Sequence, residues 1–183
     1  MISTLNEAQA VSHTLECWHA VPIPRLIAYL SETHIRWIEQ EMPSIENLAY
    51  RLEPSRTAPA VRFLQRLIRR IQNEMAEHLR KEEAILFPAI LKLEQGGSAP
   101  MPFGSISNPI AMMEQDHDIE RMLWEELRTL TNGYQITAEA GETLKTLYEE
   151  LAALAHDVSE HAALENRILF PRARRMERLV NPR

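Results

Sequence analysis

The chain has 183 residues, of which 45% are hydrophobic and 25% are charged, and its net charge is −6 at pH 7. This length fits one domain with a substantial core, and this composition excludes a disordered chain. The negative charge gives no electrostatic footprint for nucleic acid, and no apolar run approaches the roughly 20 residues of a membrane span. We therefore expect a soluble globular protein that engages neither nucleic acid nor a membrane.

The single cysteine and the first residues indicate the compartment. Cys17 has no partner for an intrachain disulfide, which is typical of a reducing environment, and the opening MISTLNEAQA lacks the basic and apolar regions of a secretory signal. We expect a cytoplasmic protein in which a short N-terminal segment, residues 1–24, precedes a domain over residues 25–180. His13, Cys17 and His19 in that segment fit an ordinary surface stretch, with a reactive thiol or an extra metal contact as the alternative.

Two helices are predicted before the middle of the chain, because apolar residues recur three or four positions apart. The first is expected to end or kink at Pro43, with Ser44–Leu52 continuing it, and the second to begin at an N-cap on Thr57 and to end or kink near Pro88. The buried stripes contain Ile27, Leu30, His34 and Trp37 in the first helix, and Leu64, Ile68, Ile71, Met75, His78, Glu82 and Ile85 in the second.

Two further helices follow a glycine-rich loop at residues 94–107. Asn108-Pro109 predicts the start of the third helix and Asn132-Gly133 its end, while Thr137 is the expected N-cap of the fourth and Pro171 lies late in it. Their stripes contain Ile110, Met113, His117, Glu120, Trp124 and Leu127, then Leu144, Leu147, Leu151, Leu154, Val158, His161, Glu165 and Ile168. Four such helices predict an all-α protein, an antiparallel up-down four-helix bundle.

The sequence repeats itself across the two halves. The stretch EHLRKEEAILFP at residues 77–88 recurs as EHAALENRILFP at residues 160–171, with seven identities in twelve positions and an offset of 83. The same offset relates His34 to His117. The bundle is therefore expected to consist of two two-helix repeats, each with a lone histidine on its first helix and a His-x-x-x-Glu pair on its second.

These histidines and glutamates predict a metal centre. They fall on buried stripes, where an ionised side chain is costly unless it is paired or binds metal. Residues four apart lie on one face of a helix, about 6 Å apart along its axis. Six such ligands exceed the needs of one tetrahedral zinc and favour two metals bridged by the glutamates. Mixed nitrogen and oxygen ligands suit iron, with manganese or zinc as alternatives. The predicted ligands are His34, His78, Glu82, His117, His161 and Glu165.

These motifs, with ILFP after each His-x-x-x-Glu pair and PIAMMEQDHD opening the third helix, resemble the hemerythrin-like (HHE) proteins. They are most similar to the di-iron branch that repairs damaged iron–sulfur clusters, the RIC family, over roughly residues 25–175. The resemblance implies a four-helix bundle with two iron ions in an oxo- or hydroxo-bridged centre. The four histidines would hold the iron, and Glu82 and Glu165 would bridge it.

The chain departs from oxygen-carrying hemerythrins at two ligand positions. Arg121 stands where those proteins place a second histidine one turn after His117, and Glu165 follows His161 by four residues where they have an aspartate five residues on. A missing ligand suits reactive or transferable iron better than reversible oxygen carriage. Fuller members of the repair family carry a cysteine-bearing N-terminal domain, in place of which about 25 residues precede the bundle here.

The expected function is a response to nitric oxide or oxidative stress, by repairing iron–sulfur clusters or by reacting with nitric oxide. The alternative is an oxygen or nitric oxide binding or sensing module without catalysis. The expected partners are these diatomic molecules and apo iron–sulfur proteins. Glu74 and Asp116 lie near the predicted ligands and fit either groups that orient imidazoles or ordinary surface charges. The oligomeric state is left open by the sequence.

Overall fold

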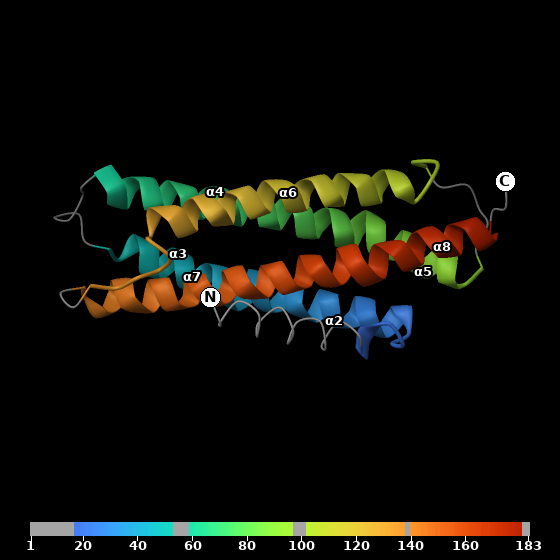
Figure 1. The fold of residues 1–183 in the computed structure, drawn as a ribbon, viewed down its shortest axis with the longest axis horizontal. Helices are drawn as coiled ribbons and strands as arrows, with labels where there is room; N and C mark the ends of the chain where they lie inside the picture. The colour runs from blue at the N-terminus through green and yellow to red at the C-terminus, as the bar shows by residue number, and fades with distance from the viewer. Residues whose placement is uncertain (1–16, 53–58, 97–101, 138–139, 181–183) are drawn as a thin grey trace, which may run out of the picture. The chain divides into compact units, whose positions relative to one another are not determined.

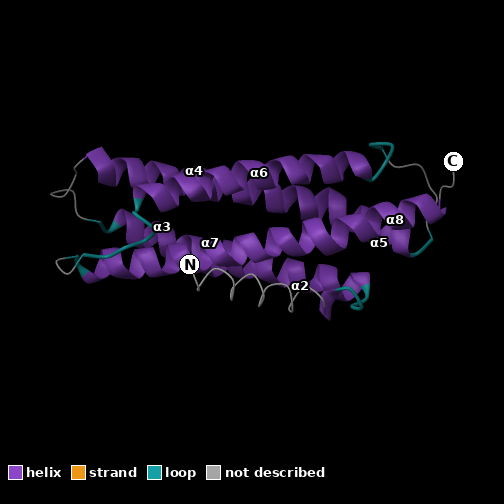
Figure 2. Cartoon of the chain, in the orientation of Figure 1, coloured by secondary structure: helices purple, strands orange, loops and turns teal. Residues whose placement is uncertain are grey.

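The computed structural model describes residues 17–52, 59–96, 102–137 and 140–180, and its elements within these ranges are helical (Figures 1 and 2). They form four rods, which confirms the predicted all-α four-helix bundle. The first rod contains α2 (Ile23–Arg36), the π-helical turn η1 (Trp37–Glu41) and α3 (Met42–Tyr50). The second contains α4 (Pro59–Lys81), the π-helical turn η3 (Glu82–Leu86) and α5 (Phe87–Glu94). The third is α6 (Ser107–Leu130), and the fourth contains α7 (Glu142–Leu164), the π-helical turn η4 (Glu165–Leu169) and α8 (Phe170–Val180).

The chain divides into two compact units, and each unit contains a segment of every rod. Unit 1 comprises residues 1–32, 81–114 and 160–183, and unit 2 comprises residues 33–80 and 115–159. Each unit has its own apolar core. The core of unit 1 includes Leu26, Leu30, Leu86, Phe87, Ile90, Ile110, Leu169 and Phe170. The core of unit 2 includes Trp37, Ile45, Leu67, Ile71, Met75, Leu127, Leu147 and Leu151.

The apolar stripe explains how α4 is built. Leu64, Ile68, Ile71 and Met75 recur every three or four residues and are buried, while the arginines between them are exposed. Burying each of these side chains stabilises the fold by roughly 1.5–3 kcal/mol. Local periodicity thus places one face of the helix in the core of unit 2, as the sequence predicts.

Two predicted helix starts are wrong and one lies outside the described residues. α6 begins at Ser107, whose N–H donates to the Ser105 hydroxyl at 3.2 Å, while the Asn108 side chain donates to the carbonyl of Phe103 at 2.8 Å instead of capping. α7 begins five residues after Thr137, at Glu142, and the carbonyl of Gly141 accepts its first hydrogen bonds. Thr57 is not among the described residues.

The predicted end of the third helix is confirmed. α6 ends at Leu130, and the Gly133 N–H donates to the Arg128 carbonyl at 2.7 Å. Asn132 and Gly133 both have positive φ, 52° and 70°, which asparagine and glycine tolerate better than other residues. This is the left-handed C-terminal geometry that closes many helices.

The rods continue past Pro43, Pro88 and Pro171, so none of these prolines ends its helical run. A π-helical turn precedes each of them. The wider turn also shifts the predicted stripe of the second helix, because Ile85 is 44% exposed while Leu86 is 1% exposed. The placement of Ile85 on the buried stripe is therefore wrong.

Among the described residues, no helix combines the length and the apolar character that crossing a bilayer requires.

Candidate metal centre

All six predicted ligands take part in two overlapping groups of buried histidines and glutamates. Within each group, one potential ligand atom from every residue lies within 4.8 Å of the others. One group contains His34, Glu82, His161 and Glu165, and the other contains His78, Glu82, His117 and Glu165. The two glutamates therefore belong to both groups, while each histidine belongs to one.

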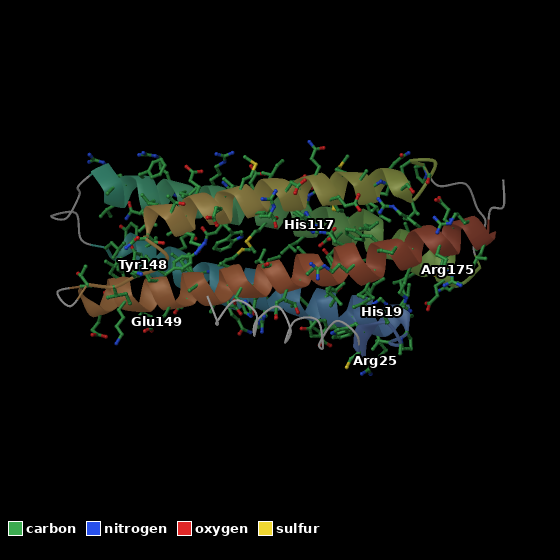
Figure 3. The ribbon with its side chains drawn as sticks, in the orientation of Figure 1. His19, Arg25, His117, Tyr148, Glu149 and Arg175 are labelled. Carbon is green, nitrogen blue, oxygen red and sulfur yellow. The ribbon has the colours of Figure 1, made fainter. Side chains whose placement is uncertain are left out.

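Every rod contributes to these groups, and local sequence explains how. His34 lies on α2, His78 on α4, His117 on α6 and His161 on α7, each on the apolar stripe of its helix. Figure 3 labels His117 part-way along α6. The apolar residues of each helix determine which face is buried. The histidines share the spacing of these apolar residues, so they lie on the same buried face.

The two glutamates are the most deeply buried members, since Glu82 and Glu165 are both 0% exposed. Each opens a π-helical turn, η3 and η4 respectively, a feature that stripe analysis did not anticipate. In unit 1, the Nε2 atom of His161 lies 3.4 Å from Oε1 of Glu165. A His-x-x-x-Glu pair thus presents its nitrogen and its oxygen side by side, as the spacing predicts.

In unit 2, the histidines of the second and third rods lie close together. The imidazole rings of His78 and His117 have centroids 4.7 Å apart, and the Nδ1 atom of His78 lies 3.6 Å from Oδ2 of Asp116. That contact directs Nδ1 towards a carboxylate and leaves Nε2 as the atom suited to a metal, which is the usual arrangement of a histidine ligand. Glu74, the other carboxylate considered for this role, is exposed.

One buried acid was on a predicted stripe but outside the predicted ligand set. Glu120 is buried in α6, one turn after His117, and it belongs to neither group of potential ligands. The helical spacing that selected His117 applies to Glu120 as well, so that signal was present in the sequence. The offset of 83 excludes it from a duplicated set, because its counterpart in the first rod is Trp37.

In the part of the chain that the structure describes, the other histidines and the cysteine do not join the groups of potential ligands. His156 is exposed, as predicted from its position off the stripe, and His19 and Cys17 are also exposed. Figure 3 labels His19 ahead of α2. His13 lies outside the described residues.

Residues 25–173 match the family described as the hemerythrin HHE cation binding domain. The chain belongs to this family. A hemerythrin-type domain therefore accounts for most of the sequence, in agreement with the resemblance found in the ligand motifs.

Relatives of this hemerythrin-family chain include several proteins named iron–sulfur cluster repair protein YtfE. The protein of Edwardsiella ictaluri (strain 93-146) is 30% identical over 173 residues, which cover 93% of this chain and 75% of that protein. The protein of Escherichia coli O81 (strain ED1a) is 33% identical over 159 residues, covering 85% and 68%. The protein of Musicola paradisiaca (strain Ech703) is 30% identical over 175 residues, covering 94% and 75%.

The donor set fits the metal that hemerythrin-family proteins hold. Imidazole nitrogens with carboxylate oxygens are ligands that suit iron, and buried carboxylates are stable only when a cation or strong donors balance their charge. Here two fully buried glutamates lie among four buried histidines. This buried cluster supports metal binding, typically of iron.

Arg121 adds no ligand to this hemerythrin-family site. It stands one turn after His117, but its side chain is 72% exposed and donates to Asp118 at 3.1 Å. Of the described residues of α6, His117 alone enters the groups of potential ligands.

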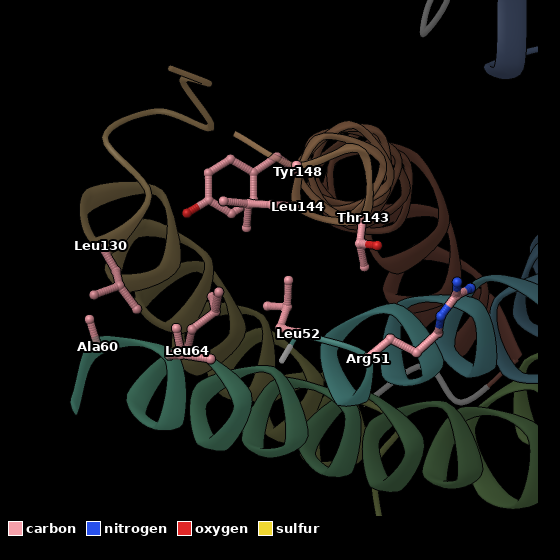
Figure 4. Close-up of a pocket in the computed structure, with 10 residues that line it drawn as sticks. Arg51, Leu52, Ala60, Leu64, Leu130, Thr143, Leu144 and Tyr148 are labelled. Carbon is pink, nitrogen blue, oxygen red and sulfur yellow. The ribbon is translucent and has the colours of Figure 1, made fainter. Parts of the chain in front are cut away.

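A separate cavity of about 510 Å³ lies in unit 2 (Figure 4). Its wall is mostly apolar, with Leu52, Leu64, Leu130 and Leu144 on it, and Tyr148 adds a phenol. Burial raises the pKa of Tyr148. None of the six histidines and glutamates lines this cavity, so it is distinct from the candidate metal centre.

Proposed function

We propose that the chain is a cytoplasmic non-heme di-iron protein that repairs iron–sulfur clusters by donating iron to damaged apo proteins. One iron would be held by the group of His34 and the other by the group of His78, with both glutamates shared. The observation that carries this proposal is the pair of overlapping four-residue groups, because carboxylates shared by two groups are suited to bridging two metals. The proposed ligands are His34, His78, Glu82, His117, His161 and Glu165.

The two irons, when bound, would supply ferrous ions for cluster rebuilding and a redox-active site for nitric oxide. The chain's own residues perform three tasks there. Four imidazoles would hold the cations, two carboxylates would offset their charge, and burial keeps bulk water away from all six side chains. Because protonated histidines and glutamates cannot bind a cation, iron is expected to leave as pH falls.

Two further observations favour iron donation over oxygen carriage. The relatives are named as iron–sulfur cluster repair proteins, and Arg121 points to solvent where an oxygen carrier has a ligand. A cation with fewer protein ligands is easier to release to an acceptor. Nitric oxide and oxygen are the small molecules proposed to reach the same site.

Anaerobic iron transfer tests the proposal. The protein is loaded with ferrous iron, its iron content is measured, and it is mixed with an apo iron–sulfur enzyme, a sulfide source and a competing chelator. We expect the enzyme to recover activity faster than with an equal amount of free iron. His117→Ala should weaken this effect, whereas His156→Ala should retain it in full, because His156 is exposed and lies outside both groups.

The same experiment distinguishes iron donation from the alternative function, the binding or sensing of oxygen or nitric oxide. If the protein holds about two irons, one for each group of ligands, and none is transferred to the apo enzyme, the repair proposal is wrong. Retained iron would then favour an oxygen or nitric oxide binding or sensing module, which keeps its metal through repeated ligand cycles.

A further inference from the structure

Three π-helical turns lie within the described residues, and each is followed by the same backbone element. The turn closes with a hydrogen bond from the N–H of the next residue to the carbonyl of the turn's first residue, and the residue after that donor is a proline. The three bonds are Met42 to Trp37, Phe87 to Glu82 and Phe170 to Glu165, and the three prolines are Pro43, Pro88 and Pro171.

The sequence repeat supplies a fourth case without the proline. The position equivalent to Pro43 in the second half is Glu126, and α6 runs as an uninterrupted α-helix from Ser107 to Leu130. Three rods with the proline have a π-helical turn, and the one rod without it has none. A proline has no N–H to donate and its ring clashes with the carbonyl four residues back, so a widened turn lets the helix continue.

The turns change which side chains face the core. In an α-helix, residues five apart point about 140° away from each other. Yet the first residue of each turn and the residue that closes it are both buried in all three rods. The buried pairs are Trp37 with Met42, Glu82 with Phe87 and Glu165 with Phe170.

We propose that Pro88 and Pro171 are positioning residues for the metal centre, because the π-helical turns that they impose fix the direction of Glu82 and Glu165. Each glutamate opens a turn, and its carbonyl accepts the hydrogen bond that closes the turn. The phenylalanine that donates this hydrogen bond, Phe87 in one rod and Phe170 in the other, is buried in the core of unit 1. The glutamate, the phenylalanine and the proline are thus linked through the backbone of one turn, and this arrangement occurs twice.

This inference rests on the proposed function, in which both glutamates bind iron. The first rod is its internal control. Pro43 follows a turn that opens with Trp37, which belongs to neither group of potential ligands. Loss of that turn should alter packing in unit 2 without redirecting a ligand.

The test compares Pro88→Ala/Pro171→Ala with Pro43→Ala. Alanine is the best helix former, so the helical rods are expected to persist in all variants. Crystal structures of the iron-free variants would show whether each turn reverts to an α-helix, and competition with a chelator would give the ferrous iron dissociation constants. We expect the double variant to lose both turns and to bind iron at least tenfold more weakly, the scale seen when groups that orient metal ligands are removed. We expect Pro43→Ala to lose its own turn and to change the constant less than twofold.

Three outcomes would overturn this role. The π-helical turns could persist without the prolines, the iron affinity could stay unchanged although the turns are lost, or Pro43→Ala could weaken iron binding as much as the double variant. A natural chain that binds no iron would instead refute the proposed function itself, and this role with it.

Discussion

The first and third rods occupy the same place in the sequence repeat, yet they are built differently. His34 and His117 are equivalent, both are buried, and each enters one group of potential ligands. Three positions later the rods diverge, because Trp37 opens a π-helical turn while Glu120 lies in an uninterrupted α-helix. The duplicated feature is thus the candidate ligand, whereas the backbone and packing beside it differ between the two rods.

The contrast shows two kinds of constraint. A metal ligand must present a particular atom at a particular place, so its residue type and register are restricted. Core packing restricts mainly total volume and apolar character, and it accepts different side chains when neighbours adjust. The two rods can therefore share a histidine while one of them carries Trp37 and the other Glu120 at the next stripe position.

The largest expected effect comes from removing the equivalent histidines. His34→Ala and His117→Ala should each lower the iron content of the chain by about half, because each histidine belongs to one of two groups. Iron per chain, measured after desalting against a weak chelator, checks this. If one variant keeps all of its iron while the other loses all of it, the two rods are not equivalent at the metal centre.

The next effect is on stability and concerns the residue that differs. Trp37→Ala should lower the free energy of unfolding by about 3–5 kcal/mol, since a fully buried aromatic side chain leaves a cavity. Denaturant unfolding of the iron-free protein measures this. Tyr50→Ala on the same rod is the control, and its exposed ring predicts a change within about 0.5 kcal/mol. A small loss for Trp37→Ala would mean that the core of unit 2 closes around the gap.

Introducing a proline into the third rod tests why its helix is uninterrupted. Glu126→Pro places a proline at the position equivalent to Pro43, which lies inside α6 near its C-terminal end. We expect a loss of about 3 kcal/mol in the free energy of unfolding, the usual cost of proline inside a helix. Pro43→Ala should change stability much less, because alanine fits a helix. If Glu126→Pro is tolerated without loss, α6 can form a π-helical turn as readily as the first rod.

The smallest effect concerns the turn after the third rod. Burial raises the pKa of Tyr134 to about 12, although Arg128 opposes the shift. The folded chain therefore keeps this proton above the ordinary pKa of 10, where the unfolded chain loses it, so the free energy of unfolding should fall as pH rises between these values. Unfolding curves at pH 9 and pH 11 measure the fall, and Tyr134→Phe should reduce it. An equal fall in natural and variant chains would assign the effect to other groups.

Sequence patterns predicted much of the fold because helices in this chain are strongly amphipathic. The stripe around Leu64, Ile68 and Ile71 depends on local spacing alone, and the structure buries it as predicted. The helix starts at Asn108 and Thr137 were wrong, because several nearby residues can cap a helix and tertiary contacts select among them. The Ile106 N–H, for example, donates to Glu177 of α8 at 2.7 Å, a contact that no local pattern reveals.

The sequence by itself determined the candidate ligands, since six polar residues on apolar stripes with one offset are visible without coordinates. Only the tertiary structure decided how Glu82 and Glu165 are presented, because the extra residue in each π-helical turn breaks the periodicity of 3.6 on which stripe analysis depends. It also decided that Ile85 faces solvent and Leu86 the core. A stripe records the spacing of an ideal helix, whereas the real backbone also has to accommodate Pro88 while keeping Phe87 buried.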